Sequence, residues 1–415
     1  MAVPKQREQG TDTMKMLIRA SLVLLVAVLT ASCGGSGTND NPNPAIKSAI
    51  DNMLTQEWST FQQTWKFSQG GIAVRLITPS GNYFSNVDLG YYTSSQLHFR
   101  GASTTKTFTA AAIMLMNQRG QLNIDDTVDS LIPGTSKTYL PNTADYAVPY
   151  KGGITIRQLL DHRAGVFDVT NDRIPTTVTA PYAGQYYVDY VLDTQGQDHT
   201  FTFDELVSVV SSNHLSYFPP ETAFHYSNTG YSMLGKIIER VSGLSYAEYV
   251  RENFIKPLGL ANTQFPDSGS QTTLPRPYAE GFTIIGGKIY ETTEANPSRS
   301  VAEGNVITTP RDLSLWISLL LSGKAGLNAD SVAMMMHVLA TGEHHEWYGL
   351  GITYTEGLGY GHNGGTAGYM TLMRYDPASK VSVVVFSSVL QADDLYSEGD
   401  LLVDVAKKAK ALSGY

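Results

Sequence analysis

The chain is organised around one stretch, Phe99-Arg100-Gly101-Ala102-Ser103-Thr104-Thr105-Lys106-Thr107-Phe108, with a Ser-x-x-Lys motif at its centre. Apolar residues at helical spacing follow it and predict a helix over 107–120. Ser103 would then lie at the helix N-terminus, with the Lys106 amine one turn on and on the same face. The amine can take the hydroxyl proton, and the helix end favours negative charge. The pattern therefore fits an activated serine, although Ser103 could equally be an ordinary N-cap.

Composition limits the class of protein. The chain has 415 residues, of which 42% are hydrophobic and 16% charged, and its net charge is -9. That content supports a large buried core in a soluble enzyme-sized protein, with one to three domains. Because the charge is acidic and no basic run is present, we expect no nucleic-acid partner.

The N-terminus carries an export signal. Lys15 and Arg19 precede an apolar run over 21–29 that is too short to span a bilayer, and small residues follow it. These small residues stand directly before Cys33, the only cysteine, and resemble a bacterial lipobox. We therefore expect a periplasmic or cell-surface lipoprotein whose lipid anchor on Cys33 binds the membrane. A plain secretory signal with an incidental cysteine is the alternative.

The chain divides into a signal over 1–33, a flexible tether over 34–44 and a globular domain over 45–412. Strand patterns occur near both ends of this domain and helices between them, which predicts an α/β part built from about 45–110 and 345–412, interrupted by a helical part over about 111–344. We expect the active site in the cleft between the two. The individual predictions are helices from near 45 and over 156–162, 204–211, 230–241, 246–254, 311–322, 328–339 and 393–412, a hairpin over 71–89, and strands over 350–354, 368–375 and 381–388.

Two further segments carry polar residues suited to catalysis. Tyr226 and Asn228 lie two apart in a predicted loop, so both side chains would face one side. A phenol can act as a general base if a cation lowers its pKa, and an amide can orient the substrate and the lysine. The second segment, 361–369, precedes an apolar strand, and its glycines would let backbone N–H groups approach a substrate, unless it is only a turn or bulge. Its candidate residues are His362, Asn363, Gly364 and Gly365.

Taken in order, Ser103, Lys106, Tyr226, Asn228, His362 and Gly364 resemble the motifs of the serine penicillin-recognising enzymes. The resemblance is closest to the group that contains class C β-lactamases, D-alanyl-D-alanine carboxypeptidases, D-aminopeptidases and related esterases. The segment over 154–166 is similar to that family's Leu-Leu-x-His-x-Ser-Gly segment, and the resemblance covers about 48–412. It implies a β-lactamase/transpeptidase-like fold of the α/β (α+β) class, in which an antiparallel sheet with flanking terminal helices carries an inserted all-α domain.

The resemblance also implies a mechanism, acyl transfer through Ser103. Lys106, together with Tyr226, would take the serine proton, and Tyr226 would later protonate the leaving group. The N–H groups of Ser103 and Gly365 would hold the oxyanion. Asn228 would position the substrate amide, and His362 would tune the polarity around Tyr226. No cofactor or metal is expected, and the partner would be a small molecule or peptide, such as a peptidoglycan stem peptide or a β-lactam.

Departures from the family pattern leave the substrate open. The third motif is His-Asn-Gly in place of the Lys-Thr-Gly usual in β-lactamases. The family's carboxypeptidases often carry an arginine on the preceding strand for the substrate carboxylate, whereas 347–361 holds neither Arg nor Lys. A carboxypeptidase-like or β-lactamase-like amide hydrolase is the main interpretation, and an esterase or D-aminopeptidase of the same fold is the alternative.

Three other interpretations compete with a serine hydrolase of this family. A metal enzyme would use the cluster His344-His345-Glu346, but the cluster lacks a second histidine at helical spacing. An α/β-hydrolase would need Gly-x-Ser-x-Gly, which the sequence lacks. A non-catalytic lipoprotein that binds penicillin or cell-wall fragments remains open. We interpret His162 and His225 as structural histidines.

Overall fold

The computed structural model describes residues 43–89, 94–342 and 347–415. The expected signal, Cys33, nearly all of the tether and the cluster at 344–346 lie outside the described residues. Within them, no helix is both long and apolar enough to cross a membrane.

An eight-stranded antiparallel sheet forms the centre, in the order β2-β1-β12-β11-β10-β9-β8-β7. The hairpin predicted near the N-terminus is present, and its first strand pairs with β12 from the end of the chain, so both ends build one sheet. The strands are β1 (Ile72–Thr78), β2 (Gly81–Val87), β7 (Leu339–Ala340), β8 (Trp347–Tyr348), β9 (Thr353–Thr355), β10 (Gly359–Thr366), β11 (Tyr369–Asp376) and β12 (Val381–Ser387).

Helices cover both faces of this sheet. The terminal helices α1 (Pro44–Trp65) and α11 (Leu395–Leu412) lie side by side on one face, and α9 (Pro310–Leu321) packs on the other. Alternation along β12 explains both contacts: Val383 and Val385 join the core under α1 and α11, whereas Val384 and Phe386 join the core that includes α9. The sheet is therefore buried on both sides.

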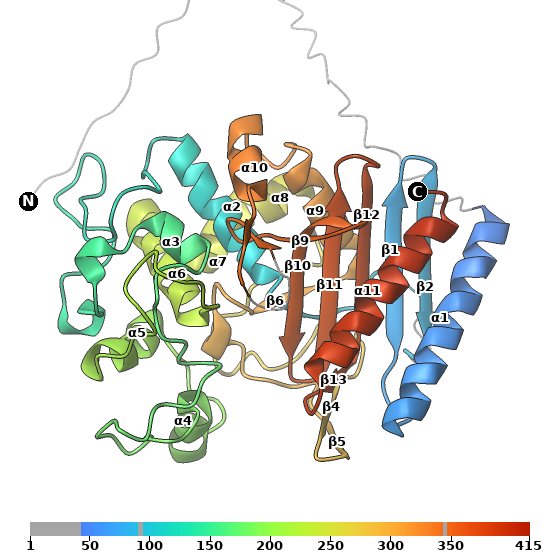
Figure 1. Cartoon of the computed structure of the whole chain (residues 1–415), viewed down its shortest axis with the longest axis horizontal. Helices are drawn as coiled ribbons and strands as arrows, with labels where there is room; N and C mark the ends of the chain where they lie inside the picture. Colours follow the sequence, from blue (N-terminus) through green and yellow to red (C-terminus); the bar gives the residue numbers. More distant parts are fainter. Residues whose placement is uncertain (1–42, 90–93, 343–346) are drawn as a thin grey trace, which may run out of the picture. The chain divides into compact units, whose positions relative to one another are not determined.

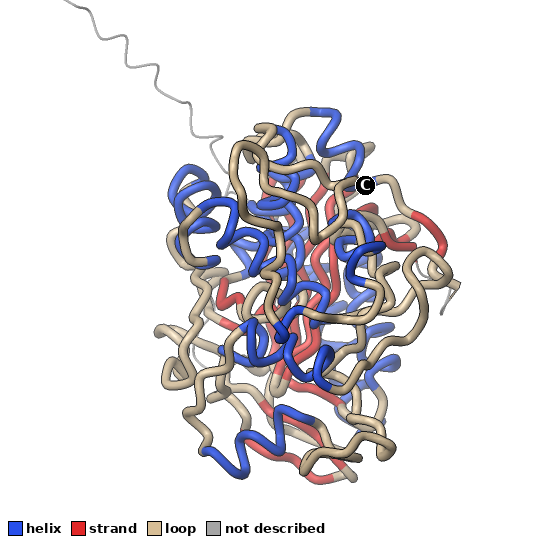
Figure 2. The backbone as a smooth tube through the Cα atoms, turned by 90° about the vertical axis from the view of Figure 1, so that its left-hand side faces the viewer, coloured by secondary structure: helices blue, strands red, loops and turns tan. Residues whose placement is uncertain are grey.

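The section between the sheet strands is mostly helix and loop, as Figure 2 shows. Its helices are α2 (Thr105–Gln118), α3 (Ile156–Leu160), α4 (Tyr187–Gln195), α5 (Phe203–Ser212), α6 (Asn228–Ser242), α7 (Tyr246–Val250), α8 (Lys256–Leu258) and α10 (Ala329–Met336). It also holds the short strands β4 (Phe282–Ile285), β5 (Lys288–Glu291) and β6 (Val306–Thr308), whereas the sequence predicted helices and loops without strands in this part. Two of them pair with distant segments: β4 with β13 (Val389–Gln391) and β6 with β3 (Phe99–Ala102).

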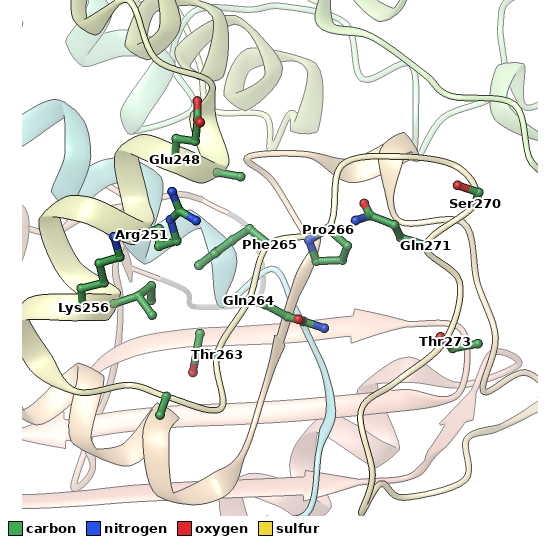
Figure 3. A pocket seen from close by; sticks show the side chains of 13 residues that line it. Glu248, Arg251, Lys256, Thr263, Gln264, Phe265, Pro266, Ser270, Gln271 and Thr273 are labelled. Atoms are coloured by element: carbon green, nitrogen blue, oxygen red, sulfur yellow. The ribbon is translucent and has the colours of Figure 1, made fainter.

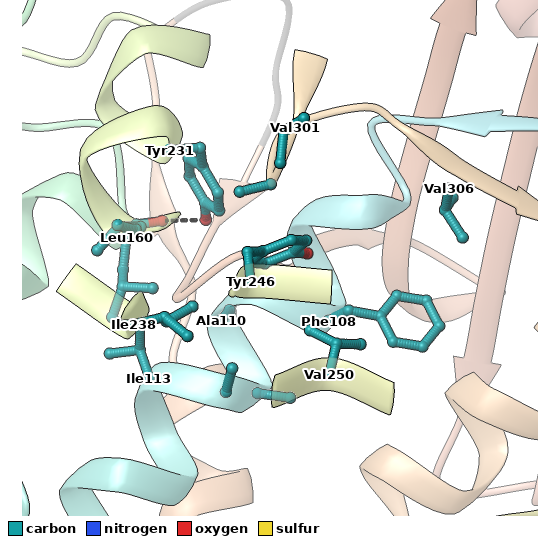
Figure 4. Packing of buried hydrophobic residues seen from close by; sticks show 14 of the residues in the cluster. Phe108, Ala110, Ile113, Leu160, Tyr231, Ile238, Tyr246, Val250, Val301 and Val306 are labelled. Carbon is teal, nitrogen blue, oxygen red and sulfur yellow. Dashed lines mark hydrogen bonds between the residues drawn. The ribbon is translucent and has the colours of Figure 1, made fainter. Parts of the chain in front are cut away.

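Helix α2 is the central buried helix, and every residue from Thr105 to Met116 is buried. Phe108 stacks on Trp316 of α9 with ring centroids 3.9 Å apart. Tyr231 of α6 donates a hydrogen bond to the Leu160 carbonyl at 2.8 Å within the same core (Figure 4). Because each buried large side chain contributes about 1.5–3 kcal/mol, α2 is held firmly, and so is the segment that precedes it.

Candidate active site

Ser103 lies between β3 and α2, and it is not the helix N-cap. Thr104 takes that position, and its hydroxyl and backbone N–H both bond the Gly101 carbonyl. Ser103 remains partly exposed, whereas Lys106 is fully buried. Since helix capping does not use Ser103, its hydroxyl is available for chemistry.

The Lys106 amine is surrounded by polar groups. Its Nζ lies 3.4 Å from Ser103 Oγ, 2.6 Å from Asn228 Oδ1 and 2.9 Å from the Glu303 carbonyl oxygen. It also lies over the Tyr226 ring, 4.6 Å from the centroid. Burial lowers the pKa of Lys106 to about 8, against the opposing charges of nearby acids. A neutral amine beside Ser103 is thus accessible near neutral pH.

Tyr226 differs from the expectation of a phenol with a lowered pKa. Burial raises its pKa well above the usual value and outweighs the hydrogen bond with Ser103, which works in the opposite direction. The resting side chain is therefore a phenol, and Lys106 is the group closest to accepting a proton.

Asn228 is the first residue of α6, with Ser227 as the N-cap, rather than part of an extended loop. Its amide orientation is fixed, because Oδ1 accepts from Lys106 while Nδ2 donates to Thr170 Oγ1 at 2.9 Å. The hydroxyl of Thr170 in turn donates to Asp168, which also accepts from the backbone N–H of Asn228 at 3.0 Å. Sequence reasoning missed Asp168 and Thr170.

Glu303 is a further buried acid beside the site that sequence reasoning missed. Its Oε2 accepts from the Ser232 hydroxyl at 3.0 Å, and its backbone carbonyl accepts from Lys106. Burial raises the pKa of Glu303 to about 8, although the Lys106 charge opposes this. The only signal in the sequence is a single acid among small and apolar residues over 301–304.

The segment with His362 and Gly364 is a strand, β10, where the sequence suggested a loop before a strand. Its glycines permit close packing: a Cβ on Gly361 would lie 1.8 Å from the Met373 carbonyl oxygen. A Cβ on Gly364 would lie 2.4 Å from the Gly101 carbonyl oxygen and 3.1 Å from Ser103 N. The strand is thus packed directly against the Ser103 segment.

One edge of β10 is open beside Ser103. Strand β9 pairs with β10 only at 359–361, where the Gly361 carbonyl accepts a hydrogen bond from the side-chain hydroxyl of Thr353. Because backbone groups of an antiparallel strand alternate in direction with period two, the N–H of Gly365 is directed toward the same edge as that carbonyl. Gly365 lines the same cavity as Ser103. Its N–H is available to a bound substrate.

Because side chains alternate along β10, His362 and Asn363 lie on opposite faces of the strand. The Asn363 side chain accepts from Arg374 Nη2 at 2.7 Å, so it lies on the strand face opposite to His362 and Gly364. The structure thus brings together Ser103, Lys106, Tyr226, Asn228, His362, Gly364 and Gly365, but not the Asn363 side chain.

His362 is neutral and held in one tautomer. Its Nδ1 bonds the Asn363 carbonyl at 2.5 Å, and because a carbonyl only accepts, that nitrogen carries the proton. Nε2 therefore accepts from the Tyr348 hydroxyl at 2.8 Å, and Tyr348 also bonds His162 at 3.1 Å. Burial and the Lys106 charge lower the pKa of His362 to about 3. A chain of neutral groups thus borders the Tyr226 ring, whose centroid lies 6.2 Å from that of His362.

The cavity at Ser103 has a volume of about 190 Å³ and is also lined by Asn228, Arg299 and Gly365. A larger cavity, about 700 Å³, lies elsewhere, beside Arg251, Lys256 and Phe265 (Figure 3), and contains none of the candidate residues. In the described part of the chain, no three His, Cys, Asp or Glu side chains are grouped to hold a metal.

Known proteins resemble this chain in sequence. The family model described as Beta-lactamase matches residues 85–407. Penicillin-binding protein 4* of Bacillus subtilis (strain 168) is 27% identical over 320 residues, which are 73% of this chain and 63% of that protein. Protein flp of Staphylococcus aureus (strain MW2) is 28% identical over 262 residues, 60% of this chain and 45% of that protein. The chain thus spans less than two thirds of either relative.

Solved structures share the fold. A D-stereospecific amidohydrolase from Streptomyces sp. has a TM-score of 0.70 at 22% identity, covering 88% of this chain and 98% of that one. The D-amino acid amidase from Ochrobactrum anthropi SV3, complexed with L-phenylalanine amide, has a TM-score of 0.69 at 21% identity, covering 89% and 98%. Because the family model covers more than half of the sequence, the chain belongs to the β-lactamase family, the serine penicillin-recognising enzymes, which are serine hydrolases.

Proposed function

We propose that this protein is an exported hydrolase that cleaves amide bonds through an acyl-enzyme on Ser103, in D-alanyl-D-alanine-type peptides or β-lactams. One observation carries the proposal: the Lys106 amine, with its lowered pKa, lies 3.4 Å from Ser103 Oγ. The names of similar proteins, a penicillin-binding protein and two amide hydrolases acting on D-residues, support the same bond type.

In the proposed reaction Lys106 takes the Ser103 proton as Oγ attacks the carbonyl carbon. The N–H groups of Ser103 and Gly365 hold the oxyanion, a contribution worth about 10²–10³ in rate for each donor. The Tyr226 hydroxyl passes a proton from Lys106 to the leaving nitrogen as the amide bond breaks. Water then attacks the ester by the reverse proton path, which releases the acid and restores Ser103.

The test compares wild type with Ser103→Ala. We expect the variant to fold, as judged by circular dichroism, and to lose labelling by a fluorescent penicillin and a fluorophosphonate. The matched control, Ser270→Ala, changes an exposed serine of the larger cavity and should label normally. Equal labelling of Ser103→Ala would show that the nucleophile is another residue.

Substrate assays in parallel decide between the alternatives. Release of D-alanine from a D-Ala-D-Ala peptide, or nitrocefin turnover, supports the proposal. Turnover confined to 4-nitrophenyl esters or to D-amino acid amides supports the esterase or D-aminopeptidase, and labelling without turnover supports a binding protein.

Anchoring through Cys33 is part of the same proposal and rests on the sequence alone. Mass spectrometry of the mature protein should find a lipidated cysteine at the N-terminus. Cys33→Ser should release the protein from the membrane fraction, whereas retention of the variant would contradict a lipid anchor.

A further inference from the structure

One arginine, Arg299, lies in the wall of the cavity that contains Ser103. It belongs to a short 3-10 turn, η4 (Ser298–Ser300), far in sequence from the strand before His362 where the family's carboxypeptidases often carry an arginine. The site therefore contains a cation that reaches it from a different part of the chain.

The turn that carries Arg299 is held rigidly. The Ser298 hydroxyl donates to Asn296 Oδ1 at 2.7 Å and accepts from the Phe201 N–H at 3.0 Å. Asn296 Nδ2 donates to the His199 carbonyl at 2.7 Å, and the Gly304 N–H bonds the Ser300 carbonyl at 2.8 Å. The backbone at Arg299 is thus fixed before any ligand binds, which lowers the entropy lost on binding.

The Arg299 guanidinium has no partner in the described part of the chain, where it makes no hydrogen bond and no ion pair. The nearby acids Asp189 and Glu303 act on it only through their charge, and burial holds most of Glu303 protonated at neutral pH. A second guanidinium, that of Arg100, adds positive charge, and its own donors bond the carbonyls of Thr272 and Thr293. A partly buried guanidinium with unused donors is suited to bind a ligand that supplies acceptors.

The position of the Ser103 cavity relative to Tyr226 indicates whether the cavity receives the acyl half or the leaving-group half of a substrate. A leaving group must lie near the proton donor, and neither Tyr226 nor His362 is among the residues that line the cavity. Gly365, whose N–H would hold the oxyanion, and Asn228, which would position the substrate amide, do line it. The cavity therefore receives the acyl half of the substrate.

We propose that Arg299 binds a carboxylate on the acyl half of the substrate, so that the enzyme selects anionic acyl donors over neutral and cationic ones. This rests on the proposed acyl-enzyme chemistry at Ser103. A guanidinium offers two parallel N–H donors to a carboxylate, and it repels an ammonium group. D-amino acid amides with a free α-ammonium group would accordingly be poor substrates.

Three 4-nitrophenyl esters with six-carbon acyl chains test the proposal: the hexanoate, the adipate monoester and the 6-aminohexanoate. For wild type we expect kcat/KM for the adipate to exceed that for the hexanoate about tenfold or more, with the cationic ester the poorest, since one charge-assisted bond is worth about that factor. Arg299→Gln should remove the preference, Arg299→Lys should retain part of it, and Arg299→Glu should favour the cationic ester. Arg251→Gln, in the larger cavity, is the control and should keep the wild-type ratios.

Binding of boronic acids separates this inference from the proposed function. Boron bonds Ser103 in place of the acyl carbon, so its substituent occupies the acyl half. By calorimetry, 4-carboxyphenylboronic acid should bind wild type about tenfold more tightly than phenylboronic acid, and Arg299→Gln should bind both equally. If wild type binds the two boronic acids with equal affinity, or has equal kcat/KM for the three esters, the role of Arg299 is overturned and the proposed hydrolase function is not. If wild type binds neither boronic acid and hydrolyses none of the esters, both the role of Arg299 and the proposed acyl-enzyme chemistry at Ser103 are overturned.

Discussion

Lys106 is held by Asn228: the distance from Nζ to Oδ1, 2.6 Å, is shorter than the 3.4 Å to the candidate nucleophile. The side-chain amide of Asn228 cannot flip to exchange its oxygen and nitrogen, because Nδ2 donates a hydrogen bond to Thr170. A neutral acceptor at this place holds the amine without adding charge. This leaves burial as the dominant influence on the Lys106 pKa.

A charged acceptor at the same place should change the pH dependence. In Asn228→Asp the new carboxylate would raise the Lys106 pKa, so we expect the acidic limb of the kcat/KM profile to move up by about one unit or more. Activity at pH 7 should then fall about tenfold. Asn228→Ala removes the acceptor without adding charge and should lower kcat without this upward shift. If the acidic limb of the kcat/KM profile stays at the wild-type pH in Asn228→Asp, Lys106 is not the titrating base.

The wild-type profile follows from the same pKa. The amine accepts the Ser103 proton only when neutral, so kcat/KM for a neutral ester should rise with pH and level off above about 8. About one tenth of the amine is neutral at pH 7. His362 should add no transition between pH 5 and 8, because its pKa is about 3. A stopped-flow profile that falls between pH 6 and 8 would contradict this assignment.

The sequence predicted those parts of the fold whose signal is local. The hairpin at 71–89, the terminal helices and α9 with its Thr309 cap follow from periodicity and capping residues. The strand β10 could not be predicted in this way, because six of its eight residues are Gly, Asn or Thr and its glycines serve contacts with Met373 and Gly101. Such contacts join distant segments and leave no periodic pattern.

The same distinction applies to the site. Ser103 and Lys106 stand in one recognisable motif, and the other candidates were found through family motifs. Asp168, Glu303 and Arg299 belong to no motif, and each reaches the site through contacts far along the chain: Asp168 bonds a backbone group sixty positions away. Only the folded chain reveals, beside the nucleophile, buried acids and a cation that has no partner among the residues that the structure describes.

Glu303→Gln should change how stability depends on pH. Burial raises the folded-state pKa of Glu303 from 4.5 to about 8, so the folded state holds a proton that the unfolded state loses. Its contribution is complete below pH 4.5 and is lost as pH rises toward 8, by up to about 1.4 kcal/mol per pH unit. Urea unfolding at pH 5 and pH 7 should therefore show a smaller loss of stability in the variant. The same loss in both proteins would mean that Glu303 is ionised in the folded state.

Gly364→Ala tests the packing of β10 against the nucleophile segment. The added Cβ would lie 2.4 Å from the Gly101 carbonyl oxygen, so β10 has to move away from Ser103. We expect a loss of stability of about 1–3 kcal/mol and a fall in kcat of about a hundredfold or more, because the oxyanion donor on this strand moves with it. The control is Gly399→Ala in α11, where the Cβ would meet only Met370 at 3.7 Å, and this variant should be as stable as wild type or more so. If Gly364→Ala keeps wild-type kcat and melting temperature, β10 does not hold the oxyanion donor at the distance from Ser103 that the chemistry needs.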